Sequence, residues 1–241
     1  MRNLWTIARR EIASYFSSPV FWVIATVFMA FSGFLFAYIL ISPGQQAEMT
    51  QLLGLYGTVM LFAAPVLSMK LLAEEQRTGT LELLMTSPIR DWQVVWGKWV
   101  GAVCMFVGLM SLTLTHVAIM LRYAEKGMDW GPLLTSYLGL FLLGSMLLAL
   151  GVFTSALTQN QAIAAFLGIM LTMVLWFLSL VKQVFSEGSW VVKTFGYLGL
   201  SDHYQTFGQG IVDSRDVIYM VTFTVGALYM ATRILESRRW R

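Results

Sequence analysis

Five long stretches of this sequence contain no Asp, Glu, Lys or Arg, at residues 12–47, 49–69, 99–121, 130–181 and 217–232. A helix that crosses the hydrocarbon of a bilayer needs roughly 20 consecutive apolar residues. The fourth stretch is long enough for two such helices, with a polar turn between them at residues 158–161. The pattern therefore predicts six transmembrane helices, at about residues 20–41, 51–71, 97–121, 133–155, 162–181 and 215–233.

Composition supports a membrane protein. The 241 residues are 57% hydrophobic and only 12% charged, whereas soluble domains carry roughly 25% charged residues. A water-soluble globule could not bury so much apolar surface, so soluble enzymes and disordered chains are excluded. The single cysteine, Cys104, excludes an internal disulfide and a cysteine-based zinc cluster. We expect an all-α integral membrane protein that forms one domain over residues 1–241.

The distribution of Lys and Arg predicts the orientation. With the N-terminus in the cytoplasm, eleven Lys and Arg residues fall in inner segments and five in outer ones. Because positive charge is enriched on the cytoplasmic side, both termini are predicted to be cytoplasmic. Residues 1–19 mix arginines with apolar side chains, which favours an amphipathic helix in the inner membrane interface. The alternative is a simple basic anchor that only fixes the topology.

The predicted cytoplasmic loop at residues 72–91 is the most charged part of the chain. Gly79 predicts a helix break, Thr80 can cap a short helix after it, and Pro88 ends that helix. A short helix with an apolar face at the membrane surface could bind a soluble partner. A solvated loop whose charges only enforce orientation is an equally good interpretation. The apolar residues of this predicted helix are Leu81, Leu83, Leu84 and Met85.

Residues 182–213 form a long predicted external segment that is rich in aromatic residues and interrupted by glycines. Broken backbone at membrane depth is tolerated where protein or water covers it, so short helices that pack over the bundle are expected. Ser201 or Asp202 is expected to cap one of these helices, and Asp213 to cap the last span. The alternative is a flexible external loop.

A stripe of small residues follows one face of the third predicted span, at spacings of three and four. Small residues let two helices approach closely. The stripe predicts a packing seam whose mate is either a helix of this chain or a second subunit. Its residues are Gly97, Gly101, Cys104, Gly108 and Ser111.

The sequence contains no phosphate-binding G-x-x-x-x-G-K-[ST] motif, no H-E-x-x-H and no G-x-S-x-G. It also lacks the basic runs expected of a nucleic-acid-binding protein. No predicted span has an ionisable residue near its middle, although ion-coupled transporters usually need one. We therefore expect the chain not to be an enzyme by itself. If it moves a substrate, the energy comes from another protein through the charged loop.

Residues 74–89 (EEQRTGTLELLMTSPI) resemble the inner loop of type-2 ABC transporter permeases. Residues 202–204, 210–219 and 235–240 are similar to one branch of these permeases. That branch includes the gliding-motility permeases and, more distantly, the nitrous-oxide-reductase maturation permeases. The resemblance extends over the whole chain and includes the number of spans.

The resemblance implies that two six-span subunits, identical or different, pair in the membrane and dock on a dimer of cytoplasmic ATPases. ATP and Mg²⁺ would be bound by the ATPases, with no cofactor in this chain. The resemblance also implies a coupling helix in the inner loop and outer re-entrant helices that close the translocation path. The implied coupling residues are Glu74, Glu75, Arg77, Gly79, Thr80, Leu81, Glu82, Leu83, Leu84 and Met85. The implied outer-gate residues are Tyr197, Asp202, His203, Tyr204, Phe207 and Asp213.

The expected function is ATP-driven export of an unidentified substrate across the inner membrane of a prokaryote. Membrane lipid, and a companion membrane protein with a large external domain, are further implied partners. The alternative is a scaffold that relays ATPase motion to an external partner and moves no solute.

Overall fold

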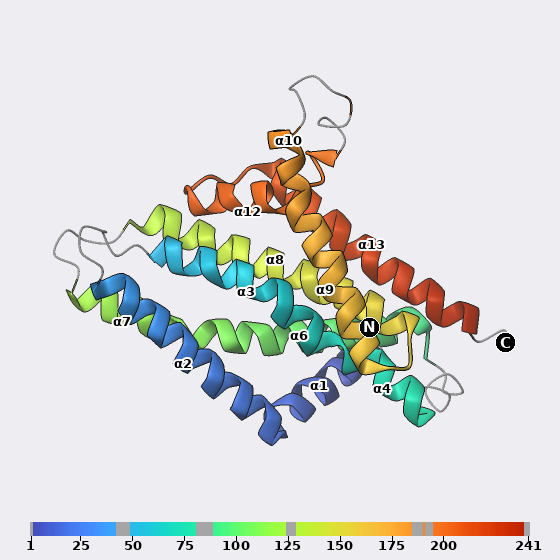
Figure 1. Cartoon of the computed structure of the whole chain (residues 1–241). Helices are drawn as coiled ribbons and strands as arrows, with labels where there is room; N and C mark the ends of the chain where they lie inside the picture. Colours follow the sequence, from blue (N-terminus) through green and yellow to red (C-terminus); the bar gives the residue numbers. More distant parts are fainter. Residues whose placement is uncertain are drawn as a thin grey trace.

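The computed structural model describes residues 2–41, 49–80, 89–123, 129–184, 190 and 195–238, and in this part of the chain all regular structure is helical (Figure 1). The helices form one elongated bundle. They are α1 (Arg2–Ser17), α2 (Pro19–Ile41), α3 (Met49–Ser68), α4 (Lys70–Thr78), α6 (Asp91–Leu112), α7 (Leu114–Tyr123), α8 (Trp130–Leu157), α9 (Gln161–Phe177), the 3₁₀ helix η1 (Leu178–Leu180), α10 (Val181–Val184), α12 (Leu200–Gly208) and α13 (Ser214–Arg238).

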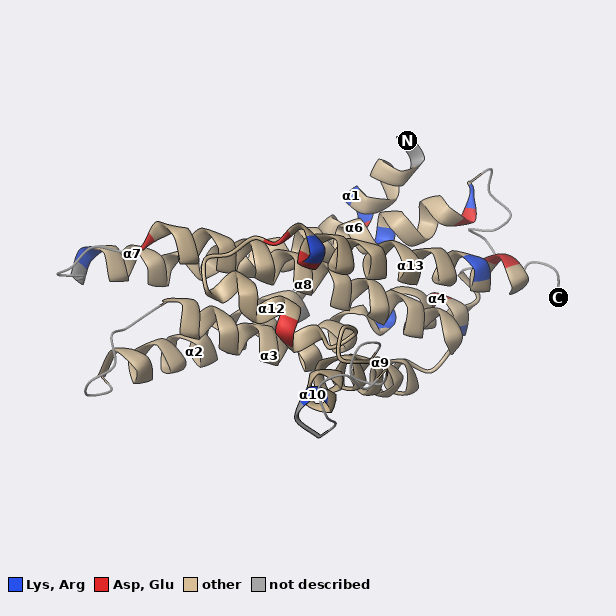
Figure 2. Cartoon of the chain, turned by 90° about the horizontal axis from the view of Figure 1, so that it is seen from above, with Lys and Arg blue, Asp and Glu red and all other residues tan. Residues whose placement is uncertain are grey.

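Six helices are long and apolar enough to cross a membrane, as the sequence predicts. They cover Phe21–Ile41, Met49–Thr78, Asp91–Arg122, Trp130–Leu157, Gln161–Leu180 and Ser214–Ser237. The second span includes α4, and the third is divided into α6 and α7 at Thr113. No charged residue occurs in α2, α3, α8 or α9. Charges lie mainly near helix ends, with long uncharged stretches between them (Figure 2).

Helix α8 is the centre of the bundle, and 78% of its most apolar window is buried. It packs against α3, α6, α9, α12 and α13. Glycines allow these close approaches, because a Cβ at Gly144 would lie 2.2 Å from a ring carbon of Phe106. Likewise, a Cβ at Gly139 would lie 2.6 Å from the Cβ of Phe207 on α12. The sequence places small residues where α8 has neighbours on every side.

Helix α3 contains Pro65 in its interior. A proline has no backbone N–H, so the carbonyl four residues earlier loses its usual helical partner. That carbonyl, on Leu61, accepts a hydrogen bond from the Thr172 hydroxyl of α9 at 3.0 Å. Gly168 of α9 lies against the Pro65 ring. The proline in α3 is thus matched by a threonine and a glycine on the neighbouring helix.

The N-terminal helix α1 lies along α6, and the chain then bends at Ser18 before α2 begins at Pro19 (Figure 1). Proline suits the first position of a helix, because the N–H that it lacks would have no partner there. We call the two ends of the bundle the α4 end and the α12 end, after the short helix at each. The α4 end also holds α1, the start of α6 and the end of α8.

Candidate functional site

Helix α4 follows α3 after Met69 and is strongly amphipathic. Its residues Leu71, Leu72 and Ala73 are buried against the bundle, whereas Glu74 and Arg77 are exposed. The helix ends at Gly79, whose φ of 72° is left-handed. Glycine adopts this conformation with little strain, which makes it the usual residue after a helix C-terminus. Glu74 and Arg77 therefore point away from the bundle on a helix with a defined end.

The start of α4 is held by Ser155 of α8. The Ser155 hydroxyl accepts hydrogen bonds from the amides of Leu72 at 3.1 Å and Ala73 at 2.9 Å. It also donates to the carbonyl of Met69 at 2.7 Å. The first amides of a helix have no partner within it, so a serine often caps them from the preceding residue. Here the cap comes from another span, which ties α4 directly to α8.

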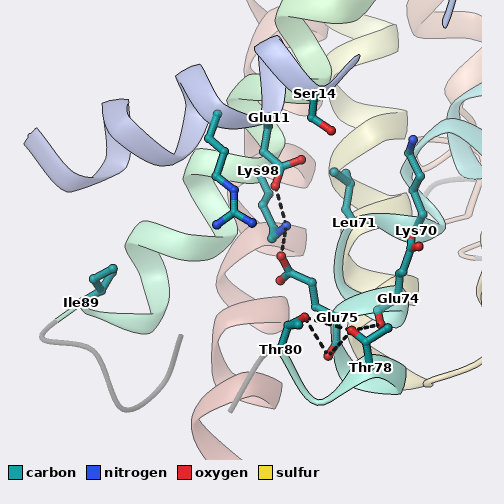
Figure 3. A pocket seen from close by; sticks show the side chains of 11 residues that line it. Glu11, Ser14, Lys70, Leu71, Glu74, Glu75, Thr78, Thr80, Ile89 and Lys98 are labelled. Carbon is teal, nitrogen blue, oxygen red and sulfur yellow. Dashed lines mark hydrogen bonds and ion pairs between the residues drawn. The ribbon is translucent and has the colours of Figure 1, made fainter. Parts of the chain in front are cut away.

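Three charged residues join α4 to two further helices (Figure 3). Lys98 of α6 places its Nζ 2.7 Å from Glu11 Oε1 on α1 and 2.8 Å from Glu75 Oε1 on α4. The Lys98 side chain is only 4% exposed, and the Glu11 and Glu75 side chains are 18% and 17% exposed. A buried ammonium is stable only when it is paired, and here it has two anions. We call Glu11, Lys98 and Glu75 the ion triad.

A cavity of about 710 Å³ opens beside the ion triad, between α1 and α4 (Figure 3). Its wall is polar and contains both signs of charge, from Arg10 and Glu11 of α1 to Lys70 and Glu74 of α4. The second carboxylate oxygen of Glu75, Oε2, is buried and accepts no hydrogen bond from the described residues. The cavity wall therefore presents charged groups of both signs to a partner from outside the chain.

Tyr15 of α1 forms a further contact with α4 at this end. The Lys70 ammonium lies over the Tyr15 ring, 4.7 Å from its centre. Burial raises the pKa of the Tyr15 hydroxyl above its ordinary value, with a smaller contribution from the negative charge of Glu11. Tyr15 is therefore neutral at physiological pH and supports α4 through its ring and its apolar contacts.

The structure places part of the predicted coupling segment at this site. Glu74, Glu75 and Arg77 lie on α4, Gly79 follows it, and the Thr80 hydroxyl lies 2.9 Å from that of Thr78. The remaining predicted coupling residues, Leu81, Glu82, Leu83, Leu84 and Met85, lie outside the described residues. A coupling helix at 80–85 thus stays a prediction.

The glycines of the predicted seam face α1 of the same chain. A Cβ on Gly97 would lie 2.9 Å from Ile7, and one on Gly101 would lie 2.6 Å from the Cβ of Glu11. Gly108 lies against the Phe16 ring. Cys104 is partly buried, and Ser111 is exposed and donates a hydrogen bond to the Gly108 carbonyl. The stripe therefore brings α1 close enough for Glu11 to reach Lys98.

The predicted outer residues gather around α12, at the opposite end of the bundle. Tyr204 and Phe207 are buried against α3 and α8, and the Tyr204 hydroxyl donates to the Leu53 carbonyl at 2.6 Å. The expected cap at Ser201 or Asp202 is wrong, because α12 already begins at Leu200, with Gly199 as its N-cap residue. Asp202 instead pairs with Lys182. Asp213 accepts a hydrogen bond from the Arg215 amide at the start of α13, as expected.

His203 connects α12 to α13 and to the chain before α12. Its Nδ1 lies 2.6 Å from Asp216 Oδ1, and its Nε2 lies 2.8 Å from the Tyr197 carbonyl. The ring stacks on Tyr219 with 4.1 Å between centres. Asp216 also accepts a hydrogen bond from Thr206. Both ring nitrogens of His203 are thus occupied by contacts within the chain, and its role in an outer gate stays a prediction.

Sequence reasoning did not identify the ion triad or the Ser155 cap. From the sequence, Lys98 is one of the positive charges that predict the orientation, and Glu11 is the last charged residue of the N-terminal basic segment. Neither observation indicates that the two side chains meet. A lysine at the first turn of an apolar span is a signal for an acidic partner, but it does not say which one. The cap was not recognisable, because Ser155 is far from α4 in the sequence.

Comparison with known families gives one match. Residues 5–231 match the family model described as ABC-2 family transporter protein. No curated protein matches the chain. The gliding-motility branch indicated by residues 202–204, 210–219 and 235–240 stays a prediction. Because the family match extends over most of the six-span bundle, the chain belongs to the ABC-2 transporter family and is a multi-pass membrane protein.

Proposed function

We propose that this chain is the membrane subunit that couples ATP hydrolysis by a separate cytoplasmic ATPase to the export of a substrate. ABC-2 family proteins are membrane subunits that work with an ABC ATPase and have no ATPase site of their own. The finer proposal is that the ATPase docks at the α4 end. It further includes pairing with a second permease subunit and a location in the inner membrane of a prokaryote.

The attachment of α4 to three helices is the observation that carries this proposal. On α8, the Ser155 hydroxyl accepts a hydrogen bond from the α4 backbone. The side-chain amide of Gln76 on α4 donates a hydrogen bond to the Ala156 carbonyl of α8 at 3.2 Å. The ion triad joins it to α6 and α1. A docked protein that pushes on α4 would therefore move α1, α6 and α8 with it, because the hydrogen bonds and ion pairs between these helices resist separation.

The cavity beside the ion triad supports docking at the same place. Glu74 and Arg77 are exposed on α4, and Glu74 also lines the cavity. A basic side chain of the ATPase could pair with Glu74 there. Thr80, the first of the predicted coupling residues 80–85, lines the cavity, so a partner that contacts Thr80 would also reach it.

Assembly with the ATPase tests this function. The chain is co-expressed with its ATPase and purified in mild detergent, and both the amount of bound ATPase and its turnover are measured. Glu82→Lys and Leu83→Asp change the predicted coupling residues and are expected to detach the ATPase or to lower its turnover. Ile211→Asp is the control for Leu83→Asp, because it adds the same negative charge at an exposed residue near α12.

Unchanged assembly and turnover in both Glu82→Lys and Leu83→Asp would contradict docking at the α4 end. A loss of ATPase binding in Ile211→Asp as well would mean that the two effects come from general damage to the fold.

A further inference from the structure

His203 of α12 and Asp216 of α13 form a buried pair at the α12 end, and their side chains are only 9% and 8% exposed. The body of α12 packs against α3, α8, α9 and η1. Its link to α13 includes two contacts of one carboxyl group, because Asp216 lies against the His203 ring and also accepts a hydrogen bond from Thr206. The protonation of this pair therefore affects how α12 is held to α13.

The contacts of the His203 ring fix the number of protons that the pair holds. Nε2 lies 2.8 Å from the Tyr197 carbonyl, and a carbonyl oxygen only accepts hydrogen bonds, so Nε2 carries a proton. Nδ1 lies 2.6 Å from Asp216 Oδ1, which is hydrogen-bond distance, so a second proton lies between these two atoms. The pair thus holds one proton more than a neutral histidine and a carboxylate together.

The surroundings of the ring favour the form in which this extra proton is on the histidine. The Tyr219 ring stacks on the His203 ring, with 4.1 Å between centres and 18° between planes. The face of an aromatic ring attracts a cation. A positive His203 ring therefore has a carboxylate at one edge and an aromatic face beside it, and both of its N–H groups have acceptors.

The other charged groups near His203 are at the surface or at the helix start. Asp202 precedes it in α12 and pairs with Lys182 of α10, and these two side chains are 39% and 46% exposed. Asp213 and Arg215 lie where α13 begins. The elements that pack against α12, namely α3, α8, α9 and η1, contain no charged residue. The protonation of His203 is thus governed mainly by its buried carboxylate partner.

Loss of the extra proton removes one of the two contacts of the ring, because a neutral imidazole has a single N–H. If this N–H is Nε2–H, the lone pair of Nδ1 faces the Asp216 carboxylate. If it is Nδ1–H, the lone pair of Nε2 faces the Tyr197 carbonyl. A hydrogen bond to an ionised acceptor is roughly twice as strong as one between neutral groups, so the ring keeps Asp216 and releases Tyr197.

The released carbonyl belongs to residues 195–199, the segment that leads into α12. This segment also contacts α13 through the Tyr219 hydroxyl, which donates to the Leu198 carbonyl at 2.8 Å. Its turn is closed by two backbone hydrogen bonds, from the Leu198 amide to the Phe195 carbonyl and from the Gly199 amide to the Gly196 carbonyl. Few contacts therefore hold the segment once His203 no longer binds it.

We infer that His203 and Asp216 form a proton-dependent clasp on the segment 195–199. The protonated pair holds this segment against α12 and α13, and the deprotonated pair releases it. The charge of a histidine ordinarily changes between pH 5 and 8, so the clasp closes in acid and opens as the pH around the α12 end rises. The clasp needs no ATPase, so its failure in a test would leave the proposed coupling function untouched.

Nitrogen-15 NMR of the chain in nanodiscs, with label only in histidine, tests the protonation. The chain has two histidines, His116 and His203, and the signals that disappear in His203→Gln belong to His203. At low pH both nitrogens of His203 are expected to carry protons, and as the pH rises Nε2 is expected to lose its proton while Nδ1 keeps one. A ring whose protonation is the same from pH 5 to pH 9 overturns the inference.

Hydrogen exchange of the amides of Leu198 and Gly199 tests the release, after correction for the intrinsic effect of pH on exchange. Their protection is expected to fall about tenfold as His203 loses its proton, which is the effect of losing one hydrogen bond of about 1.4 kcal/mol. Asp216→Asn is expected to abolish this pH dependence, because its amide N–H can donate to Nδ1 while Nε2–H stays on the Tyr197 carbonyl at every pH.

His203→Gln is also expected to abolish the pH dependence, since it removes the titrating ring. Asp202→Asn is the matched control, because it neutralises an exposed carboxylate one residue away and should leave the pH dependence unchanged. The inference is overturned if the protection in the wild-type chain does not depend on pH. It is equally overturned if His203→Gln or Asp216→Asn keeps the dependence, or if Asp202→Asn loses it.

Discussion

Replacing Lys98 by methionine is expected to destabilise the α4 end more than any other single loss of positive charge among the described ion pairs. Methionine fills much of the space of the lysine stem but leaves Glu11 and Glu75 without their shared cation. Both carboxylate oxygens lie within 2.8 Å of one nitrogen, so they are at most about 5.5 Å apart. Two unit charges at that separation repel by about 3 kcal/mol at an effective dielectric constant of 20.

Two comparisons bound this value. Removing one partner of a buried ion pair typically costs about 3–5 kcal/mol in total, and this total includes such repulsion. The Glu11 and Glu75 side chains are 18% and 17% exposed, so solvent screens part of it. We expect a net loss of about 2–4 kcal/mol, and for a chain of this size about 2–4 °C in melting temperature per kcal/mol.

The assay is thermal unfolding of the purified chain in mild detergent. Lys182→Met is the matched control, because it breaks an exposed pair with Asp202, and exposed pairs contribute about 0–1 kcal/mol. The triple variant Glu11→Gln, Glu75→Gln, Lys98→Met removes all three charges and is expected to recover most of the lost stability. The reasoning is refuted if Lys98→Met melts like Lys182→Met, or if the triple variant melts no higher than Lys98→Met.

Three further predictions follow from single contacts and use the same thermal assay. Gly101→Ala places a Cβ 2.6 Å from Glu11 and is expected to cost about 1–3 kcal/mol, whereas Gly226→Ala, with no neighbouring atom within 4 Å, is expected to be neutral. Thr172→Val leaves the Leu61 carbonyl without its donor and is expected to cost about 1–3 kcal/mol. This cost should shrink in a Pro65→Ala background, where the helix N–H returns. Asp216→Asn removes the carboxylate that faces His203 and Thr206, with an expected loss of about 1.5–3 kcal/mol, and the exposed Asp202→Asn is its control. If a variant and its control have the same melting temperature, the contact that the variant removes does not contribute to stability. If Thr172→Val costs as much in the Pro65→Ala background as in the wild-type chain, the pairing of Thr172 with the Leu61 carbonyl does not compensate for the proline.

The number and positions of the spans were predictable, because a bilayer imposes a length and an apolar composition that are visible in one dimension. The break of the third span at Thr113 was not. Its hydroxyl bonds to the Met110 carbonyl and lies 2.9 Å from the Tyr137 hydroxyl on α8. Such a break depends on a partner 24 residues away, which local hydropathy does not contain.

The charged end of the candidate site was visible in the sequence, but its contacts were not. The charge density of the loop after the second span indicates a functional end, and Glu74, Glu75 and Arg77 lie there. The glycine stripe indicates close packing, but its spacing is equally compatible with a partner in this chain or in another. The choice between them depends on where α1 lies, and that follows from the fit of Ile7 and Glu11 against Gly97 and Gly101.

Helix α8 connects the two ends of the molecule, which gives a prediction about transmission. Ser155 holds α4, and twenty residues earlier, about 30 Å along the helix, the Thr135 hydroxyl donates to the Phe207 carbonyl of α12 at 2.7 Å. If motion passes from α4 through α8 to α12, these two contacts act in series. Ser155→Ala and Thr135→Val should then each lower ATPase turnover of the assembled complex, and the double variant should be no slower than the slower single variant.

Stability provides the internal control for this test. The two sites are far apart and share no partner, so their losses of melting temperature should add. Additive losses of stability together with non-additive losses of turnover would support transmission through α8. Losses of turnover that multiply in the double variant would mean that the two ends act independently, and a rigid α8 would then have no role in coupling.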